Sequence, residues 1–371
     1  MEKNKVSLLH EDLVKSVSIA NRFIPLRPSI PVLANILLKA QRGKLTVSAT
    51  NLETAITIEV PAKTNGEWEI TTPAKILSEF LTTTTGKEVV LEVEKESLKV
   101  GTENASGKIS GITASEFPKL PSEEKGERLE FDQKEFQEAV NNVAFAASID
   151  EGKPILTGIL LRNEGGKTII VATDGYRLGK KELKTKYGLE ETLIGAKTLV
   201  EVLKIAGELG EEKLNLSISK ENNQVIFSGE NFILAGRLLA GTYPNFSQII
   251  PTKFGLKIEA NRAELISAIK SAAVFARDVG NVVKLEVSPK GQIKISANTL
   301  QVGEGEASLP AVVSGEELRV AFNSRYLLDG LNTLKEEVVE INFSGVLSPA
   351  LLRNKNEASF IYIVMPVKAQ N

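Results

Sequence analysis

The length and charge of the chain set the first limits on its function. It has 371 residues, of which 42% are hydrophobic, so it can bury the cores of two or three ordinary domains. Its 45 basic and 47 acidic residues leave a formal net charge of -2, which argues against nucleic-acid binding driven by bulk charge. There is no cysteine and only one histidine, His10, which excludes disulfides, thiolate chemistry and metal sites rich in Cys or His. We expect no metal and no cofactor.

No stretch of the sequence is typical of a targeting or membrane segment. The first residues are charged throughout, and no segment approaches the roughly 18 consecutive apolar residues of a membrane span. We therefore expect a cytoplasmic protein without a membrane partner.

An internal repeat with a period near one third of the chain organises the sequence. Each third is predicted to open with an amphipathic helix, at residues 10–23, 132–148 and 261–277, because apolar residues recur at i, i+3, i+4 and i+7. A strand with a similar small turn follows each helix: LTVSATNLE, IIVATDGYRL and IKISANTLQV. The alanines Ala49, Ala172 and Ala297 mark the same position in these three strands.

A second helix is predicted after each strand, at residues 73–86, 195–210 and 323–337, and alternating strands then complete each third. An early basic residue recurs in these helices, as Lys75, Lys197 and Arg325. The sequence thus predicts an α+β fold of three tandem similar modules, each with two helices and antiparallel sheets. We expect the modules to span residues 1–125, 126–253 and 254–371.

Catalytic motifs are absent from the sequence. The nearest approach to a phosphate-binding loop, Gly101 to Ile109, has five residues between its glycines and an isoleucine where Ser or Thr is needed, so it predicts a hairpin turn. Ser217 to Lys220 matches S-x-x-K but lies in a predicted strand. Asp174 precedes a glycine, which is typical of a turn rather than of a catalytic acid. We therefore expect no catalytic residue and no enzyme activity.

Six segments, spread in order over all three modules, resemble one family. They are RPSIPVLANILL, SEFPKLP, VATDGYRL, GTYPNFSQIIP, FNSRYLLDGL and YIVMPVK. Together they are similar to the bacterial β sliding clamps, the β subunits of DNA polymerase III. The resemblance implies the DNA clamp fold and a head-to-tail homodimeric ring around double-stranded DNA, bound without regard to sequence. It also implies tethering of the polymerase III catalytic subunit, the clamp loader and other proteins with a clamp-binding motif, which confers processivity in DNA replication.

Basic residues on the exposed faces of the predicted helices form a candidate DNA lining: Lys15, Arg22, Lys75, Lys134, Lys197, Lys204, Arg262, Lys270, Arg277, Arg325 and Lys335. Such side chains touch phosphates without reading bases, although lysine-rich helix faces are also common on soluble proteins. The resemblance and the repeated helix position favour five DNA-binding residues: Arg27, Lys75, Lys153, Lys197 and Arg325. The loop at residues 150–154 lacks the aromatic residues that related clamps can carry, which argues against base stacking there.

The resemblance also implies a pocket for partner peptides between the second and third modules. Its expected lining is Leu156, Thr173, Gly175, Tyr176, Arg177, Leu178, Pro244, Ile249, Asn323, Tyr326, Val346, Ser348, Ile363, Val364, Met365, Pro366 and Val367. Met and aliphatic side chains suit an adaptable apolar groove for a peptide with a glutamine and bulky apolar residues. The alternative is that residues 361–366 form only a core strand. Gln248 stands where some relatives have an arginine, so selectivity at that edge is expected to differ.

Ring closure would bring the first module of one copy to the third module of the other. By resemblance the dimer interface includes Lys75, Lys108, Ile109, Val274 and Phe275, an apolar centre with charged edges. Two other functions stay open: a repeat scaffold that binds proteins but not DNA, and a hydrolase built on acidic residues. In a ring, the near-neutral charge is compatible with attachment to DNA by topology rather than by affinity.

Overall fold

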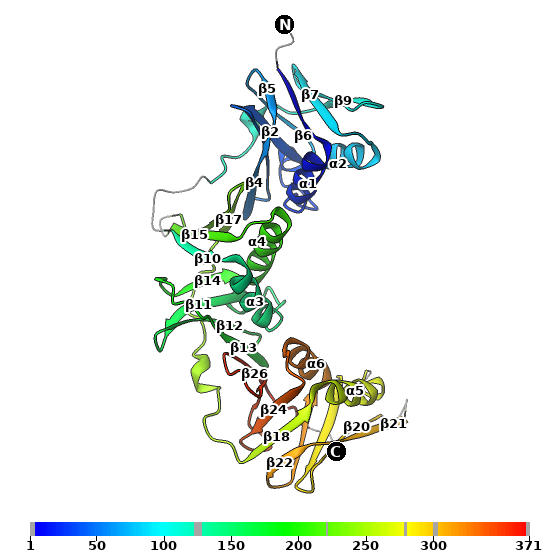
Figure 1. The fold of residues 1–371 in the computed structure, drawn as a ribbon, viewed down its shortest axis with the longest axis vertical. Coiled ribbons are helices and arrows are strands. Elements are labelled where there is room, and N and C mark those ends of the chain that lie inside the picture. Colours follow the sequence, from blue (N-terminus) through cyan, green and yellow to red (C-terminus); the bar gives the residue numbers. More distant parts are fainter. Residues whose placement is uncertain (1–3, 122–127, 220–221, 278–279, 300–302, 369–371) are drawn as a thin grey trace. The chain divides into compact units, whose positions relative to one another are not determined.

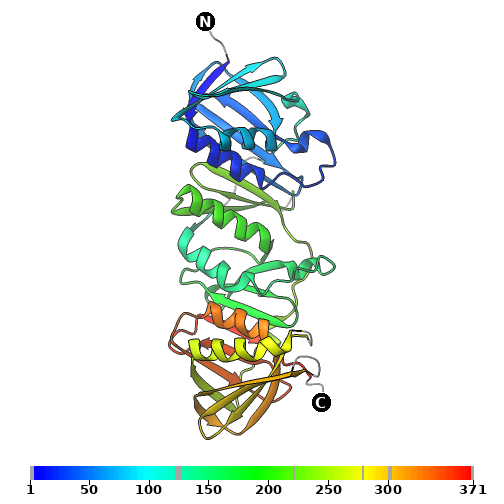
Figure 2. The same ribbon diagram turned by 90° about the vertical axis from the view of Figure 1, so that its right-hand side faces the viewer.

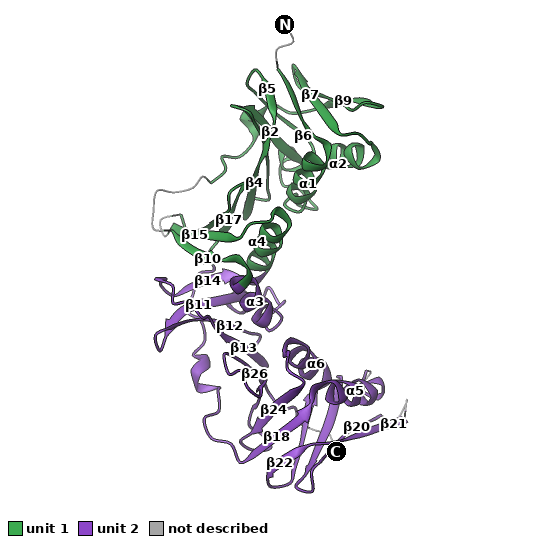
Figure 3. Cartoon of the chain, viewed as in Figure 1, with its two compact units in different colours: residues 1–134, 197–238 green, residues 135–196, 239–371 purple. Residues whose placement is uncertain are grey.

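The structure is a computed structural model that describes residues 4–121, 128–219, 222–277, 280–299 and 303–368. The chain forms two compact units, one of residues 1–134 and 197–238, the other of residues 135–196 and 239–371 (Figure 3). The predicted second module is divided between the two units. Each unit contains one long sheet, and that sheet combines strands of the second module with strands of a neighbouring module. The module boundaries stay a prediction, and the first of them lies outside the described residues.

Unit 1 contains two sheets and the helices that pack on them (Figure 1). Its helical elements are α1 (His10–Asn21), η1 (Pro31–Ala34), α2 (Ala74–Thr83), η2 (Ala114–Glu116), and all but the first residue of α4 (Ala196–Leu209). Its strands are β1 (Lys5–Leu9), β2 (Asn35–Gln41), β3 (Lys44–Thr50), β4 (Thr54–Pro61), β5 (Lys63–Asn65), β6 (Trp68–Pro73), β7 (Glu88–Glu94), β8 (Ser97–Gly101), β9 (Ser106–Ser110), β10 (Leu129–Asp132), β15 (Lys213–Ser219), β16 (Gln224–Ser228) and β17 (Phe232–Arg237).

Unit 2 has the same kind of construction. Its helical elements are α3 (Gln133–Ala144, whose first two residues belong to unit 1), η3 (Pro154–Thr157), η4 (Phe246–Gln248), α5 (Arg262–Ala273), η5 (Val274–Ala276) and α6 (Ser324–Thr333). Its strands are β11 (Gly158–Glu164), β12 (Lys167–Thr173), β13 (Arg177–Glu182), β14 (Thr192–Gly195), β18 (Leu256–Asn261), β19 (Val282–Ser288), β20 (Gln292–Thr299), β21 (Gly303–Pro310), β22 (Val312–Gly315), β23 (Leu318–Asn323), β24 (Val338–Phe343), β25 (Ala350–Asn354) and β26 (Phe360–Val364).

Within the described residues, each unit has one long sheet and one shorter sheet, and all strand pairs are antiparallel. Unit 1 has an eight-stranded sheet, β10-β15-β16-β17-β4-β3-β2-β6, and a five-stranded sheet, β5-β1-β7-β8-β9. Unit 2 has a nine-stranded sheet, β14-β11-β12-β13-β26-β25-β24-β18-β22, and a four-stranded sheet, β21-β20-β19-β23. The hairpin turn predicted within Gly101 to Ile109 is present between β8 and β9.

The predicted threefold repeat is present in the order of the elements. Strands β4, β13 and β21 are equivalent, as are β9, β17 and β26. Two of the resulting pairs, β4·β17 and β13·β26, join half-sheets of successive repeats into the two long sheets. Strands β9 and β21 instead end the two shorter sheets.

The helices lie side by side within each repeat, as α1 with α2 and α5 with α6 (Figure 2). Their buried faces follow the predicted period, for example Leu265, Ile269 and Ala272 in α5. Asn261 is the N-cap of α5, and its side chain accepts hydrogen bonds from the backbone N–H groups of Ala263 and Glu264 at 2.9 and 3.1 Å. The helix predicted to end at residue 277 changes to a 3₁₀ turn at Val274.

Candidate peptide and nucleic-acid binding sites

The turn between β12 and β13 supplies one wall of the candidate peptide surface. The Thr173 hydroxyl donates to the Arg177 carbonyl at 2.6 Å and accepts the Gly175 N–H at 3.0 Å. The Asp174 carboxylate accepts the N–H groups of Tyr176 and Arg177 at 2.8 and 3.0 Å. Gly175 has a φ of +93°, a left-handed conformation that favours glycine. The turn therefore holds Tyr176 outward, with its side chain exposed.

Arg177 anchors this turn to α6 and to Phe145, the residue after α3, within unit 2. Its guanidinium donates to Asp174 at 2.9 Å and to Asp329, and it is only 13% exposed. It also stacks over the rings of Tyr326 and Phe145, 4.5 and 5.6 Å from their centres. Burial opposes its charge, but neighbouring acidic groups outweigh that effect and raise the pKa of the guanidinium. Arg177 is thus already engaged in the structure, so it shapes the surface before any peptide arrives.

An apolar cluster underlies the turn. Leu178 lies opposite Ile363 in the β13·β26 pair, and both are 1% exposed. They pack with Tyr243 and Phe246, against which Ile249 lies partly buried. The predicted pocket residues Leu178, Ile363 and Val364 are therefore buried at the junction beneath the turn.

The chain after β26 runs alongside this turn. The Met365 N–H donates to the Tyr176 carbonyl at 2.9 Å, and the Val367 N–H donates to the Ala321 carbonyl on β23 at 2.9 Å. Residues Met365, Pro366 and Val367 are partly buried, and Val346 in the β24–β25 loop is exposed. This segment thus extends beyond the core strand and links two sheets of unit 2. The alternative that residues 361–366 form only a core strand fits Phe360–Val364 but not Met365 and Pro366.

The remaining predicted pocket residues occupy varied environments. Pro244 is exposed, whereas Leu156 and Ser348 are partly buried. Asn323 caps α6 by accepting the Arg325 N–H at 2.9 Å and donates to the Gly280 carbonyl at 3.3 Å. Its side chain is therefore committed to local structure.

The sequence did not predict that Arg177 contacts Phe145 and Asp329. It also did not predict that the Tyr362 hydroxyl donates to the carbonyl of Tyr326, the ring on which Arg177 stacks. A signal was present for Asp329, because it takes the sixth position of its helix, as Glu79 and Glu201 do in the equivalent helices. Tyr362 is fully buried, and burial raises the pKa of its phenol.

The predicted DNA-binding residues all lie at exposed positions. Arg27 and Lys153 are in the loops before η1 and η3. Lys75, Lys197 and Arg325 each take the second position of equivalent helices α2, α4 and α6. A cation at that position opposes the helix dipole, so its threefold recurrence indicates a role other than helix stability.

Three other basic residues from the candidate lining have protein partners. Arg22 donates to Glu201 and Glu208 at 3.0 and 2.6 Å, linking α1 to α4 within unit 1. Arg262 donates to the Glu336 and Leu331 carbonyls, and Lys335 donates to Glu138. These contacts reduce their availability for phosphates.

The predicted dimer residues divide between two strand edges. Lys108 and Ile109 are on β9, and the Lys108 ammonium lies 3.4 Å from the Glu94 carboxylate. Val274 and Phe275 are in η5, which packs on β20 and β21. Lys75 lies 3.9 Å from Glu79, one helical turn away, and both are well exposed.

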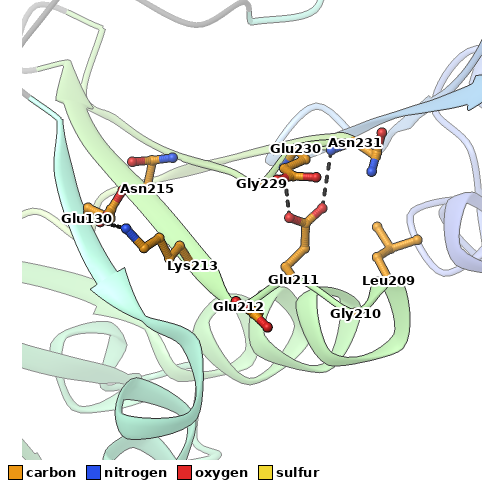
Figure 4. A pocket seen from close by; sticks show the side chains of 10 residues that line it. All are labelled: Glu130, Leu209, Gly210, Glu211, Glu212, Lys213, Asn215, Gly229, Glu230 and Asn231. Carbon is orange, nitrogen blue, oxygen red and sulfur yellow. Dashed lines mark hydrogen bonds and ion pairs between the residues drawn. The ribbon is translucent and has the colours of Figure 1, made fainter.

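A polar hollow in unit 1 has a structural role (Figure 4). The Glu211 carboxylate accepts the N–H groups of Glu230 and Asn231 at 2.8 and 3.2 Å, and the Asn231 carbonyl accepts the Glu59 N–H at 2.8 Å. Glu211 therefore fixes the β16–β17 turn beside β4. Across the described residues, no three His, Cys, Asp or Glu side chains are grouped to hold a metal ion. None of the helices in that part of the chain has the length and apolar character to cross a membrane.

Comparisons with known proteins agree across the whole chain. Models of the N-terminal, central and C-terminal domains of the DNA polymerase III beta subunit match residues 4–121, 130–245 and 247–368. The beta sliding clamp of Synechococcus elongatus is 29% identical, covering 99% of this chain and 100% of that one. The Bacillus subtilis beta sliding clamp is 28% identical over 98% of this chain and 99% of its own.

Solved structures give the same result. The sliding clamp of Bacillus subtilis superposes with a TM-score of 0.92 at 27% identity, covering 99% of both chains. The beta subunit from Thermotoga maritima gives 0.91 at 25% identity, over 99% of this chain and 100% of that one. The predicted three-module α+β fold is confirmed, and so is the absence of an enzymatic role, since sliding clamps are processivity factors. The chain therefore belongs to the DNA polymerase III beta subunit family, the beta sliding clamps.

Proposed function

We propose that two copies of this chain close head to tail into a ring that encircles double-stranded DNA and tethers replication proteins to it. One observation carries the proposal. The long sheets join equivalent strands of successive repeats, β4·β17 and β13·β26, whereas the third equivalent pair, β21 and β9, remains at the ends of two shorter sheets. Edge strands of this kind are ready to pair with another chain. In a pair of copies, β9 of each copy can pair with β21 of the other, so no free edge of this kind remains and the assembly closes.

The interface residues would be Lys75, Lys108, Ile109, Val274 and Phe275. Ile109 on β9 is buried, while Val274 in η5 is 49% exposed. Pairing of β9 with β21 would cover Val274 and bring Lys108 near the acidic face of β21, which carries Glu304 and Glu306. Apolar contact supplies most of the free energy of association, and the charges favour correct alignment.

The DNA contacts would come from Arg27, Lys75, Lys153, Lys197 and Arg325. They are dispersed and exposed, and three of them sit at helix N-termini, where the backbone also attracts phosphate. Such contacts are weak, sequence-independent and sensitive to salt. The ring would hold the protein on DNA, and these residues would guide the duplex through it.

The partner surface would take a peptide with a glutamine and bulky apolar residues between Tyr176, Val346 and the 365–367 segment. The DNA polymerase III catalytic subunit, the clamp loader and other proteins with a clamp-binding motif would compete for it. These roles place the protein in the cytoplasm with the chromosome.

Removal of residues 365–371 tests the partner surface; the last three lie outside the described residues. This truncation deletes the Met365 and Val367 hydrogen bonds and should abolish binding of such a peptide in a fluorescence-polarisation titration. Removal of residues 369–371 alone is the matched control and should leave binding intact. Unchanged binding in the longer truncation would refute the assignment.

The mass in solution tests the ring. Sedimentation velocity at micromolar concentration should give the mass of two chains. A monomer would contradict the ring and favour the alternative of a protein-binding scaffold that does not encircle DNA.

A further inference from the structure

The surface proposed above for a partner peptide continues along one end of the nine-stranded sheet of unit 2. Resting on that proposed function, we infer that Leu347 and Phe254 form an apolar extension of this surface. The extension takes the apolar residues that flank a partner's glutamine-containing motif. Neither residue belongs to the lining expected from the sequence. Partners would therefore be distinguished by the residues beside the motif as well as by the motif itself.

One row of the nine-stranded sheet brings both parts of this surface to the same end. The row crosses five neighbouring strands through directly opposed residues (Figure 1): Arg177 on β13, Val364 on β26, Ala350 on β25, Phe343 on β24 and Leu256 on β18. Each of these strands begins or ends at this row. Tyr176, Met365, the β24–β25 turn and Phe254 therefore follow one another along this end of the sheet. Four strand spacings separate the first strand from the last, about 19 Å.

The β24–β25 turn carries two apolar side chains at its tip. The Ser348 N–H donates to the Gly345 carbonyl at 3.2 Å, which closes a four-residue turn around Val346 and Leu347. Their side chains are 53% and 74% exposed. Gly, Pro, Asn, Asp and Ser are the residues that favour such turns, so the turn conformation does not require this pair. Adjacent apolar side chains that a tight turn holds in water indicate a contact with another molecule.

The equivalent turns of the repeat have no apolar pair. Hairpins β7–β8 and β15–β16 are equivalent to β24–β25, because each follows the second helix of its repeat. The first has Lys95 and Glu96 between its last paired residues, and the second has the sequence KENN at residues 220–223. Apolar residues therefore occur in the one turn of the three that lies beside the 365–367 segment. This coincidence favours a role in partner binding over a role in the hairpin.

Phe254 continues the apolar surface beyond the turn. The Ser344 hydroxyl donates to the Lys253 carbonyl, and the Gly255 N–H donates to the Phe343 carbonyl at 2.9 Å. These hydrogen bonds hold the backbone on both sides of Phe254 against the end of β24. The Phe254 side chain is 39% exposed. The tip of the turn lies between one and two strand spacings from β18, about 7 Å, which about two residues of an extended peptide would cross.

The apolar character of the extension determines which partner segment it fits. Burial of Leu347 and Phe254 by a partner removes apolar surface from water, which is favourable only if the partner segment is apolar too. Val346 belongs to the motif surface and shares the turn with Leu347. The motif and its flank can therefore belong to one continuous peptide. A partner with the same motif and a polar flank would bind without this contribution.

Synthetic peptides in a fluorescence-polarisation titration test the extension. The short peptide has five residues, with one glutamine and bulky apolar residues; two long peptides add three apolar residues at one end or the other. The wild-type protein should bind one of the long peptides about fivefold more tightly than the short one. Leu347→Ser should abolish this gain, and Phe254→Ser should reduce it. Both should change the affinity for the short peptide by less than about twofold.

Val312→Ser is the matched control. Val312 is 68% exposed on β22 of the same unit, three residues along that strand from the end of the sheet that carries Leu347. This variant should keep both the affinity for the short peptide and the gain of the long one. Leu347→Met keeps an apolar side chain at the turn and should retain the gain; loss of the gain in this variant would contradict an apolar contact.

The outcomes separate the extension from the partner surface itself. Equal affinity of the wild-type protein for short and long peptides would overturn the extension and leave the partner surface in place. A gain that survives Leu347→Ser would have the same meaning. Failure of the wild-type protein to bind any of the peptides would overturn the partner surface and its extension together. Thermal unfolding of Leu347→Ser should match that of the wild type, because the side chain is largely exposed.

Discussion

The same turn occurs in both units with different side chains on it. In unit 1 the Thr50 hydroxyl donates to the Thr54 carbonyl and accepts the Leu52 N–H, and Asn51 accepts the N–H groups of Glu53 and Thr54. In unit 2 residues 173–177 repeat every one of these hydrogen bonds. Thr and Asn or Asp at this spacing thus determine the backbone of the turn.

The difference lies in what the turn displays. Unit 1 has Glu53 and Thr54 where unit 2 has Tyr176 and Arg177. Arg177 reaches across to α6, and the exposed Tyr176 bonds the 365–367 segment through its carbonyl. Among the residues that the structure describes, the turn at residues 50–54 makes neither kind of connection. A repeated scaffold therefore acquires a candidate binding surface through two side chains and one terminal segment.

The largest expected effect comes from Arg177→Ala. It removes a largely buried guanidinium that pairs with both Asp174 and Asp329, which should lower the free energy of unfolding by about 3 kcal/mol. Peptide binding should be lost as well. Urea unfolding and a peptide titration measure the two effects. The matched change in unit 1, Thr54→Ala, should cost about 1 kcal/mol or less and leave peptide binding unchanged; equal costs would contradict the distinction drawn between the turns.

The hydroxyl substitutions Thr50→Val and Thr173→Val should have similar, intermediate effects. Each keeps the side-chain shape but leaves a carbonyl and an N–H without the threonine hydroxyl, for a loss of about 1.5 kcal/mol. Urea unfolding of the two variants is the measurement. If the losses of unfolding free energy in the two variants differed from each other by more than about 1.5 kcal/mol, the two turns would not be energetically equivalent.

A smaller effect is expected from the left-handed position. Leu52 has a φ of +74°, where the equivalent Gly175 has +93°. Gly175→Ala should destabilise the protein by about 1 kcal/mol, because nothing crowds the site and only the backbone conformation opposes a Cβ. Leu52→Gly should stabilise it by about 0.5 kcal/mol, because relief of strain is partly offset by the flexibility of glycine in the unfolded chain. Shifts of the opposite sign in thermal unfolding would contradict this.

The smallest effect is a dependence on pH at the β13·β26 junction. Hydrogen bonds from Lys181 and Ser359 lower the pKa of Glu357 from its ordinary value near 4.5 to about 2. Because the folded pKa lies below the unfolded one, this stabilisation is present above about pH 5 and is lost as the pH falls towards 2. Glu357→Gln should remove that part of the pH dependence in unfolding curves from pH 7 to pH 3. Unit 1 has Ile58 in place of Lys181, so the β4·β17 junction has no equivalent titration.

The repeat, the helices and the turns could be predicted from the sequence because their signals are local. The spacing of apolar residues marks the helices, the Asn261 cap marks the start of α5, and a Thr followed by Asn or Asp marks the turns. Each of these signals acts within a few residues. The pairing of β4 with β17 and of β13 with β26 could not, because nothing local specifies which edges meet over such a separation. For the same reason the contact between Arg177 and Asp329, 152 residues apart, could not be predicted from the sequence.

Retention on DNA tests the central claim most directly. After loading by the clamp loader proposed above as a partner, the protein should remain on circular DNA at a salt concentration that abolishes its binding to short duplexes. It should leave when a single cut linearises the circle, because a ring slides off free ends. Loss from intact circles and linear DNA alike, or equal retention on both, would contradict topological attachment.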